Sequence, residues 1–263
     1  MNSVRPKKSL GQHFLKDLQI ARKIADTLDD FKHLPVLEVG PGMGVLTQFL
    51  LEKEFDLTVV ELDWDSVTYL HKHFPQLEDR ILGEDFLQMD LSTLFQTPFC
   101  VIGNYPYNIS SQIFFKVLDY KEQIPCCSGM IQKEMAERLA SPPGKKSYGI
   151  ISVLLQVWYD IDYLFTVSEK VFDPPPKVKS AVIRMVRNSR TTLDCDERLL
   201  KTVVKTAFNQ RRKTMRNSLK PLLGKDCGLY SLPVFDKRPE QLSVEQFIEL
   251  TNLVAEQLGK TNN

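Results

Sequence analysis

Short apolar runs that end in a glycine or a polar residue recur through the first part of the chain. Residues 36–39, 57–60 and 99–103 are followed by a glycine, a glutamate and an asparagine, respectively. Short apolar runs that are bounded in this way are typical of buried strands. Residues 80–83 and 180–186 show the same character. We therefore predict an α/β sheet, in which polar side chains at the carboxyl ends of the strands form the site.

The last quarter of the chain shows a helical spacing of apolar residues instead. Apolar positions within residues 199–208 recur at intervals of three and four, which predicts an amphipathic helix. A further helix is predicted to begin after Ser243, because Ser243 and Gln246 match the capping-box pattern. Gly259 is expected to end that helix. The end of the chain is therefore predicted to form a small helical domain.

A polar stretch at residues 188–196 separates the two patterns. We place the domain boundary there, with residues 1–188 forming the sheet-containing domain and residues 189–263 forming the helical one. Within the first domain, residues 148–158 are expected to form a helix and residues 161–167 a further strand.

A glycine-rich segment follows the first predicted strand. Gly40, Gly42 and Gly44 have the spacing of a ligand-binding turn, because glycine is used where the backbone turns tightly or approaches a ligand closely. The third glycine of the dinucleotide fingerprint is missing, and Pro41 lacks the N–H group that would help to cradle a pyrophosphate. The segment indicates a nucleotide-type cofactor, while a NAD-binding loop and a plain turn remain alternatives.

Acidic residues follow the next two predicted strands. Glu61 lies about twenty residues beyond the glycine segment, where an acidic side chain commonly binds ribose hydroxyls. Asp85 follows the strand at residues 80–83 and is a candidate acceptor for the amino group of a cofactor adenine. Both acids favour a cofactor that contains a nucleoside.

The segment Asn104-Tyr105-Pro106-Tyr107 follows the strand at residues 99–103. The side-chain oxygen of Asn104 and a backbone carbonyl near Pro106 can each accept a hydrogen bond from a flat aromatic amine. Tyr107 offers a ring face for stacking on a base that has left its helix. The segment therefore suggests chemistry on the amino group of a nucleobase. The alternative is a strand-ending turn, in which the asparagine caps the backbone and the tyrosines pack in the core.

Four candidate residues thus follow four successive strands: Gly40, Glu61, Asp85 and Asn104. This arrangement resembles class I methyltransferases, in which S-adenosylmethionine and an amine acceptor meet at the carboxyl ends of the strands. Five motifs together make the chain similar to the ribosomal RNA small-subunit adenine N6,N6-dimethyltransferases of the KsgA/RsmA family, from Lys7 to about Pro239. These motifs lie at residues 8–15, 38–44, 104–110, 172–180 and 209–214.

The resemblance implies a fold and a cofactor. Residues 1–188 would form a Rossmann-like, S-adenosylmethionine-dependent methyltransferase domain of class I, and residues 189–263 a small α-helical domain that binds RNA. The N-terminal segment is expected to close over the methionine end of the cofactor, where His13 makes a polar contact. The residues that the resemblance assigns to S-adenosyl-L-methionine are Gln12, His13, Leu15, Gly40, Gly42, Glu61, Asp85 and Asn104.

The resemblance also implies roles at the target base. Asn104 would orient the amine, while Tyr107 and Phe172 would stack on opposite faces of the target adenine. Position 105 is usually leucine in this family and is Tyr105 here, which leaves the other contacts untouched if its side chain points away. The reaction requires the nitrogen, the methyl carbon and the sulfur to be held in line, so we assign no metal and no dedicated general base.

A net charge of +1 conceals two basic ends of the chain. Residues 1–23 contain six Lys or Arg and one Asp, and residues 190–263 contain thirteen Lys or Arg and nine Asp or Glu. We expect these ends to contact RNA phosphates, with an ordinary solvated surface as the alternative. The candidate RNA-binding residues are Arg211, Arg212, Lys213 and Arg216.

Other sequence features exclude several classes of protein. No apolar run approaches the roughly 18 residues that a membrane-spanning helix needs, and no secretion signal is visible. The five cysteines show no C-x-x-C spacing, which favours reduced thiols. We therefore expect a cytoplasmic protein, which we take to be a monomer. The resemblance implies that its partner is small-subunit ribosomal RNA within an assembling 30S-type particle.

The function implied by the resemblance is methyl transfer to N6 of two adjacent adenosines near the 3′ end of 16S ribosomal RNA, which gives N6,N6-dimethyladenosine during small-subunit biogenesis. One alternative is a large-subunit ribosomal RNA adenine methyltransferase of the antibiotic-resistance type. Another is a non-catalytic RNA-binding assembly factor on the same scaffold.

Overall fold

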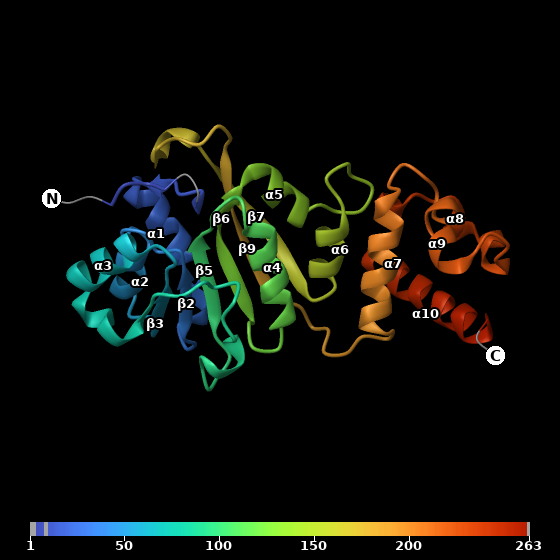
Figure 1. The fold of residues 1–263 in the computed structure, drawn as a ribbon, viewed down its shortest axis with the longest axis horizontal. Helices are drawn as coiled ribbons and strands as arrows, with labels where there is room; N and C mark the ends of the chain where they lie inside the picture. Colours follow the sequence, from blue (N-terminus) through green and yellow to red (C-terminus); the bar gives the residue numbers. More distant parts are fainter. Residues whose placement is uncertain (1–3, 8–9, 262–263) are drawn as a thin grey trace. The chain divides into compact units, whose positions relative to one another are not determined.

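The computed structural model describes residues 4–7 and 10–261, so Lys8 and Ser9 of the first motif lie outside the described residues. The chain divides into two compact units, each of which is formed by two segments of sequence (Figure 1). The first unit comprises Met1–Ala136 and Asp160–Arg187, and the second comprises Glu137–Tyr159 and Asn188–Asn263.

A seven-stranded sheet is the largest sheet in the described part of the chain, with the strand order β4-β3-β2-β5-β6-β9-β7. The first five strands in this order run parallel, and β9 pairs antiparallel with β6. The strands that we predicted from apolar runs are confirmed. Their bounds are β2 Val36–Val39, β3 Leu57–Val60, β4 Ile81–Leu82, β5 Cys100–Asn104, β7 Tyr159–Val167 and β9 Ser180–Arg187. The sheet also contains β6 Cys126–Gln132, for which we made no prediction.

Parallel pairing explains why the strands are so apolar. All four residues of β2 are buried, because strands on both sides and helices on the faces remove them from water. The helices that lie wholly within this unit are α1 Leu18–Asp26, α2 Thr47–Glu52, α3 Trp64–His73 and α4 Ser110–Asp119, while α5 Lys133–Leu139 spans the break after Ala136. Ile24 of α1, Leu50 of α2 and Leu70 of α3 belong to one core cluster with Val36 of β2. The four strand ends are therefore fixed by a shared core.

A second, two-stranded sheet joins distant parts of the first unit. β1 (Phe14–Leu15) pairs antiparallel with β8 (Phe172–Asp173), and the Lys16 N–H donates to the Val171 carbonyl at 2.8 Å. The N-terminal segment is thus held against the chain just before β9.

The second unit is helical in its described residues. Its helices are α6 Ile150–Gln156, α7 Glu197–Asn209, α8 Met215–Ser218, α9 Lys220–Leu223 and α10 Val244–Thr261. The ring centroids of Phe208 and Phe247 lie 6.0 Å apart, so α7 and α10 share an aromatic contact. The predicted capping box is confirmed: Ser243 N–H donates to Gln246 Oε1 at 3.1 Å, and Gln246 N–H donates to Ser243 Oγ at 3.2 Å.

The predicted end of α10 is wrong. The helix continues past Gly259 to Thr261, and Gly259 does not adopt the positive φ of a C-terminal glycine cap. A glycine in a helical conformation costs only about 1 kcal/mol relative to alanine, which is too little to end a helix by itself.

The compact units also differ from the division at residues 188 and 189. One break between the units follows Arg187, one residue before the predicted boundary. However, residues 137–159, which we placed in the first domain, belong to the second unit. The reason is that α6 and the turn before it pack on α7, with the Tyr148 and Phe208 ring centroids 6.2 Å apart. The apolar spacing of α6 predicted a helix but not the helix against which it packs.

Candidate active site

A cavity opens where the parallel strands end in the first unit. It is lined by the N-terminal segment, the turn after β2, the residues after β3 and β4, and the end of β5. All eight residues predicted for the cofactor line it, as does Tyr107. The sequence therefore predicted correctly which strand ends would converge, because parallel strands place their carboxyl ends at one edge of the sheet.

The glycine segment after β2 contributes to the lining of this cavity. Gly40 and Gly42 have φ values of 69° and 57°, a left-handed conformation that side chains other than glycine rarely adopt. A Cβ atom on Gly42 would also lie 2.9 Å from a ring carbon of Phe14. The turn thus needs glycine for its backbone and for the close approach of the N-terminal segment.

Glu61 ties two parts of the site together. Its Oε2 accepts from the Gly42 N–H at 3.0 Å, and its Oε1 accepts from the Asp63 N–H at 2.9 Å. Burial raises the pKa of Glu61, while the hydrogen bonds from the backbone oppose this rise. The carboxylate has about four lone-pair sites, so it can still accept from a ligand hydroxyl beside these backbone groups.

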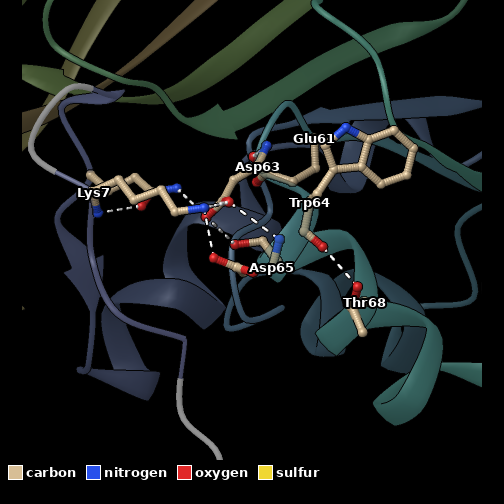
Figure 2. A network of polar contacts seen from close by, with 8 residues as sticks. Lys7, Glu61, Asp63, Trp64, Asp65 and Thr68 are labelled. Atoms are coloured by element: carbon tan, nitrogen blue, oxygen red, sulfur yellow. Dashed lines mark hydrogen bonds and ion pairs between the residues drawn. The ribbon is translucent and has the colours of Figure 1, made fainter.

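A network around Asp63 holds the N-terminal segment beside Glu61 (Figure 2). Lys7 Nζ contacts the buried Asp63 carboxylate and lies 2.6 Å from Asp65 Oδ2. Gln12 Nε2 donates to Asp63 Oδ2 at 3.1 Å, and Gln12 Oε1 accepts from the Lys7 N–H at 2.7 Å. Burial acts to raise the pKa of Asp63, but the hydrogen bonds from Lys7 and Gln12 outweigh it and hold the pKa below its usual value.

This network was not anticipated from the sequence. Asp63 accepts from the Asp65 N–H at 3.2 Å and thereby caps the start of α3. This capping position was the one feature of Asp63 that the sequence could have indicated. Its pairing with Lys7 joins residues 56 positions apart and has no local pattern. Gln12, which we predicted to contact the cofactor, lines the cavity while its amide group binds Lys7 and Asp63.

Glu38 is a further carboxyl group that lines the cavity, and we assigned it no role from the sequence. It is 1% exposed and accepts from the Thr47 hydroxyl at 2.7 Å. Burial raises the pKa of Glu38 to about 8, against the lowering effect of the Thr47 hydrogen bond. The sequence does contain a hint of such a role, because Glu38 is the one acidic residue in the otherwise apolar strand β2. A cationic ligand in the cavity would favour the ionised form of this group and lower its pKa.

Asn104, at the end of β5, is held by the N-terminal segment. Its Nδ2 donates to the His13 carbonyl oxygen at 3.2 Å. No described residue of the protein donates to its Oδ1 in a recorded hydrogen bond, so this oxygen is available to accept from a ligand. The orientation of the amide is thus set by a residue 91 positions away.

Tyr105 belongs to the lining of the cavity, but its ring and hydroxyl are buried in the core. Its side chain is 1% exposed, and its hydroxyl donates to the Ser128 carbonyl at 2.8 Å. Gly103 and Gly129 make room for the ring, since a Cβ at either position would lie within about 3 Å of it. The tyrosine at this position therefore leaves the contacts of Asn104 and Tyr107 unchanged.

Tyr107 and His13 form an aromatic pair at the cavity. Their ring centroids are 5.5 Å apart with an interplanar angle of 28°. The Tyr107 hydroxyl contacts Ser180 Oγ, and His13 Nδ1 lies 2.8 Å from the Pro174 carbonyl. Burial raises the pKa of Tyr107, so the hydroxyl is neutral at physiological pH.

Phe172, which we predicted to stack on the target base, is buried in this structure. Its side chain is 1% exposed, belongs to the core cluster and is not among the residues that line the cavity. The reason is the strand alternation in β8, which turns Phe172 inward and Asp173 outward. In this structure Phe172 packs the core beneath the N-terminal segment.

The predicted RNA-binding residues all lie in the second unit and differ in their surroundings. Arg211 donates to the Lys145 carbonyl at 3.3 Å and lies 4.0 Å from Glu240, and Arg216 pairs with Asp236 at 2.5 Å. Arg212 and Lys213 are exposed.

Two searches of the described residues bear on metals and membranes. Within residues 4–7 and 10–261, no three His, Cys, Asp or Glu side chains are grouped so that they could hold a metal ion. None of the described helices combines the length and the apolar character needed to cross a membrane.

Comparisons with known proteins agree with the geometry of the site. Residues 3–256 match the family model for ribosomal RNA adenine dimethylase. A Parabacteroides distasonis protein named ribosomal RNA small subunit methyltransferase A is 75% identical over 260 residues, which cover 99% of this chain and 98% of that protein.

Two solved structures resemble the fold. The crystal structure of a dimethyladenosine transferase from Plasmodium falciparum has a TM-score of 0.79 at 22% identity and covers 93% of this chain and 98% of that one. The 23S ribosomal RNA methyltransferase ErmE has a TM-score of 0.68 at 25% identity and covers 91% and 99%. The predicted class I methyltransferase fold is therefore confirmed. A family match over nearly the whole chain, together with the strand-end cavity and its Asn-Tyr-Pro-Tyr segment, shows that this protein belongs to the ribosomal RNA adenine dimethylase family.

Proposed function

We propose that this enzyme transfers methyl groups from S-adenosyl-L-methionine to N6 of two adjacent adenosines near the 3′ end of small-subunit ribosomal RNA. The observation that carries the proposal is the arrangement of Asn104. Its Nδ2 is bound to the His13 carbonyl, which leaves Oδ1 to accept a hydrogen bond from an amine at the cavity. An oxygen acceptor at that point selects and orients an exocyclic amino group.

The residues of the cavity fit S-adenosyl-L-methionine. Glu61 and Asp85 supply carboxylate acceptors for the ribose hydroxyls and the adenine amine, and both line the cavity. The buried Glu38 favours a ligand that carries positive charge, as this one does at its ammonium and sulfonium groups. When bound, the cofactor supplies an electrophilic methyl carbon.

The protein's own contribution to the transfer is orientation. Asn104 accepts one hydrogen of the target amine, and a backbone carbonyl near Pro106 accepts the other. Tyr107 offers a ring face to the target base, and His13 stacks on that tyrosine. Holding the reacting atoms in line supplies most of the rate enhancement that such a site can give. The proton of the methylated amine passes to solvent, and we assign no general base.

The small-subunit substrate is supported by the relatives. The Parabacteroides distasonis protein is 75% identical and its name specifies the small subunit, whereas the 23S ribosomal RNA methyltransferase ErmE is 25% identical. ErmE shares the fold, so a large-subunit substrate is the second candidate. We further propose that the substrate is an assembling 30S-type particle in the cytoplasm, that the protein acts as a monomer, and that no metal takes part.

The test is methyl transfer from labelled S-adenosyl-L-methionine to small ribosomal subunits that lack their adenine dimethylations, with nuclease mapping of the product. Dimethyladenosine at two adjacent sites near the 3′ end is the expected result. Large-subunit RNA serves as the competing substrate in the same assay, and label there alone would favour the second candidate. RNA binding without any transfer would indicate a non-catalytic assembly factor.

A further inference from the structure

Lys116 is a half-buried residue of α4, the helix that begins shortly after the Asn104-Tyr105-Pro106-Tyr107 segment. Its ammonium group lies against the chain that follows β4, from which Asp85 and Phe86 line the strand-end cavity. We assigned no role to this lysine from the sequence. In the folded chain it connects the helix behind the predicted amine site to the predicted adenine site.

Backbone carbonyls and aromatic rings surround the ammonium group. Lys116 Nζ donates to the Leu87 carbonyl at 3.1 Å and also donates to the Met89 carbonyl. It lies 5.5 Å from the ring centroid of Phe86 and 5.8 Å from that of Tyr120, within reach of cation–π attraction. No carboxylate of the described residues forms an ion pair with it, so its direct partners are main-chain oxygens and ring faces.

This ammonium group is also partly withdrawn from water. Burial lowers the pKa of Lys116, and the nearby charges of Asp85, Asp90 and Asp119 oppose this effect. A lysine that only solubilises a helix surface extends its charged end into water. Here the hydrogen bonds to two carbonyls replace the lost hydration. The arrangement is therefore typical of a lysine that fixes a stretch of backbone.

The stretch of backbone that Lys116 fixes is the one that orients Asp85. The Leu87 N–H donates to Asp85 Oδ1 at 2.9 Å, and the Met89 N–H donates to the Asp85 carbonyl at 3.1 Å. The two residues whose N–H groups hold Asp85 are thus the same two whose carbonyls accept from Lys116. One side chain of α4 in this way secures the turn that brings Asp85 to the cavity.

We infer that Lys116 is a positioning residue for Asp85 and thereby determines the preference of the cavity for adenine over other bases in the cofactor. The inference rests on the proposed function, in which Asp85 accepts a hydrogen bond from the adenine amine. A site built to bind an amino group rejects an analogue that lacks it, provided that the acceptor is held in place. Hypoxanthine carries an oxygen where adenine carries the amine, and would place that oxygen against the carboxylate. Loosening the turn should therefore weaken binding of the adenine ligand more than binding of the hypoxanthine ligand.

The test measures ligand binding by the full-length protein in the absence of RNA. Calorimetry compares S-adenosylhomocysteine with S-inosylhomocysteine, which differs from it only in the base. The adenine preference is the dissociation constant of the inosyl ligand divided by that of the adenosyl ligand. Lys116→Met removes the ammonium group and is expected to lower this preference about tenfold, the order of one hydrogen bond to a charged group. An unchanged preference overturns the inference.

A conservative variant tests whether the N–H donors are responsible. Lys116→Arg retains a positive charge and several N–H donors, so its adenine preference is expected to lie within about threefold of the wild-type value. A preference as low as that of Lys116→Met would overturn the inference. Lys116→Gln, which keeps an amide donor, takes the place of Lys116→Met in the same comparison if urea unfolding shows the methionine variant to be unfolded.

Tyr120→Phe is the matched control. The Tyr120 hydroxyl donates to Asp90 Oδ1 at 3.1 Å, so this variant loses a hydrogen bond from the end of the same helix to the chain just beyond Met89. It leaves Lys116 and its two carbonyl acceptors in place, and its adenine preference is expected to equal that of the wild type. A fall as large as that of Lys116→Met would show that any loosening of this region suffices, and the inference would fail.

Kinetics supply a second readout. In methyl transfer to small ribosomal subunits, Lys116→Met is expected to raise KM for S-adenosyl-L-methionine about tenfold and to leave kcat within about threefold, because the base is remote from the transferred methyl group. A loss confined to kcat overturns the inference. The binding comparison does not depend on the RNA substrate, so a failure to methylate small subunits would refute the proposed function alone. Equal binding of the two ligands by the wild type would refute the inference alone.

Discussion

Asn104 Nδ2 donates a hydrogen bond to the main-chain carbonyl of His13, 3.2 Å away and 91 residues distant in sequence. The same N-terminal segment pairs through β1 with β8 and is held through Lys7 by Asp63. The segment that lines the strand-end cavity thus also fixes the orientation of the Asn104 amide. Under the proposed function, this hydrogen bond links the N-terminal segment to the residue that orients the amine.

Replacing Asn104 by alanine removes the acceptor for the target amine. We expect the Asn104→Ala enzyme to lose at least about a hundredfold in kcat, because the amine is no longer oriented toward the methyl carbon. The dissociation constant for S-adenosyl-L-methionine, measured by calorimetry, is expected to stay within a few-fold of the wild-type value. Near wild-type kcat would refute the role of Asn104.

Replacing Lys7 by glutamine breaks the contact that holds the N-terminal segment at Asp63. Lys7→Gln is expected to weaken cofactor binding about threefold, since partly exposed ion pairs contribute little individually. Lys16→Gln is the matched control, because Lys16 is exposed in the same segment and lies outside the lining of the cavity. Equal cofactor affinities for both variants and the wild type would exclude a role for the Lys7 contact.

The raised pKa of Glu38 predicts that the protein loses stability as the pH rises. Its pKa is raised from 4.5 to about 8 in the folded protein, so between these values the unfolded chain releases a proton that the folded protein retains. The free energy of unfolding should therefore fall as the pH rises from 4.5 to 8 and should level off above that range. Urea unfolding across this range should show that Glu38→Gln flattens the decline. An equally steep decline in the variant would place its origin elsewhere.

Substitutions of Phe172 distinguish a role in core packing from a role in stacking on the target base. If it packs the core, as its 1% exposure indicates, Phe172→Ala should lower the free energy of unfolding by about 3–5 kcal/mol. Urea unfolding measures this loss, with Phe172→Leu expected to lose less because more apolar volume is retained. Unchanged stability together with a collapse of kcat would restore the stacking role.

Local chemistry made much of the fold predictable from the sequence. Short apolar runs bounded by turn residues correspond to β2, β3, β4 and β5, because a strand buried on both faces must be apolar along its length. The capping box at Ser243 depends on residues three positions apart, so it too could be read directly. The convergence of Gly40, Glu61, Asp85 and Asn104 followed from the single assumption that the strands run parallel.

Tertiary structure alone decided the features that join distant residues. The sequence identified Phe172 as a candidate aromatic residue, and its burial in the core was decided by the pairing of β8 with β1. Asn104 was recognised as a hydrogen-bonding residue, yet its orientation depends on a carbonyl of the N-terminal segment. The run of basic residues after α7 gave no sign that Arg216 pairs with Asp236. Periodicity reports which face of an element is buried, whereas the partner that buries it is selected by packing and hydrogen bonding across the whole chain.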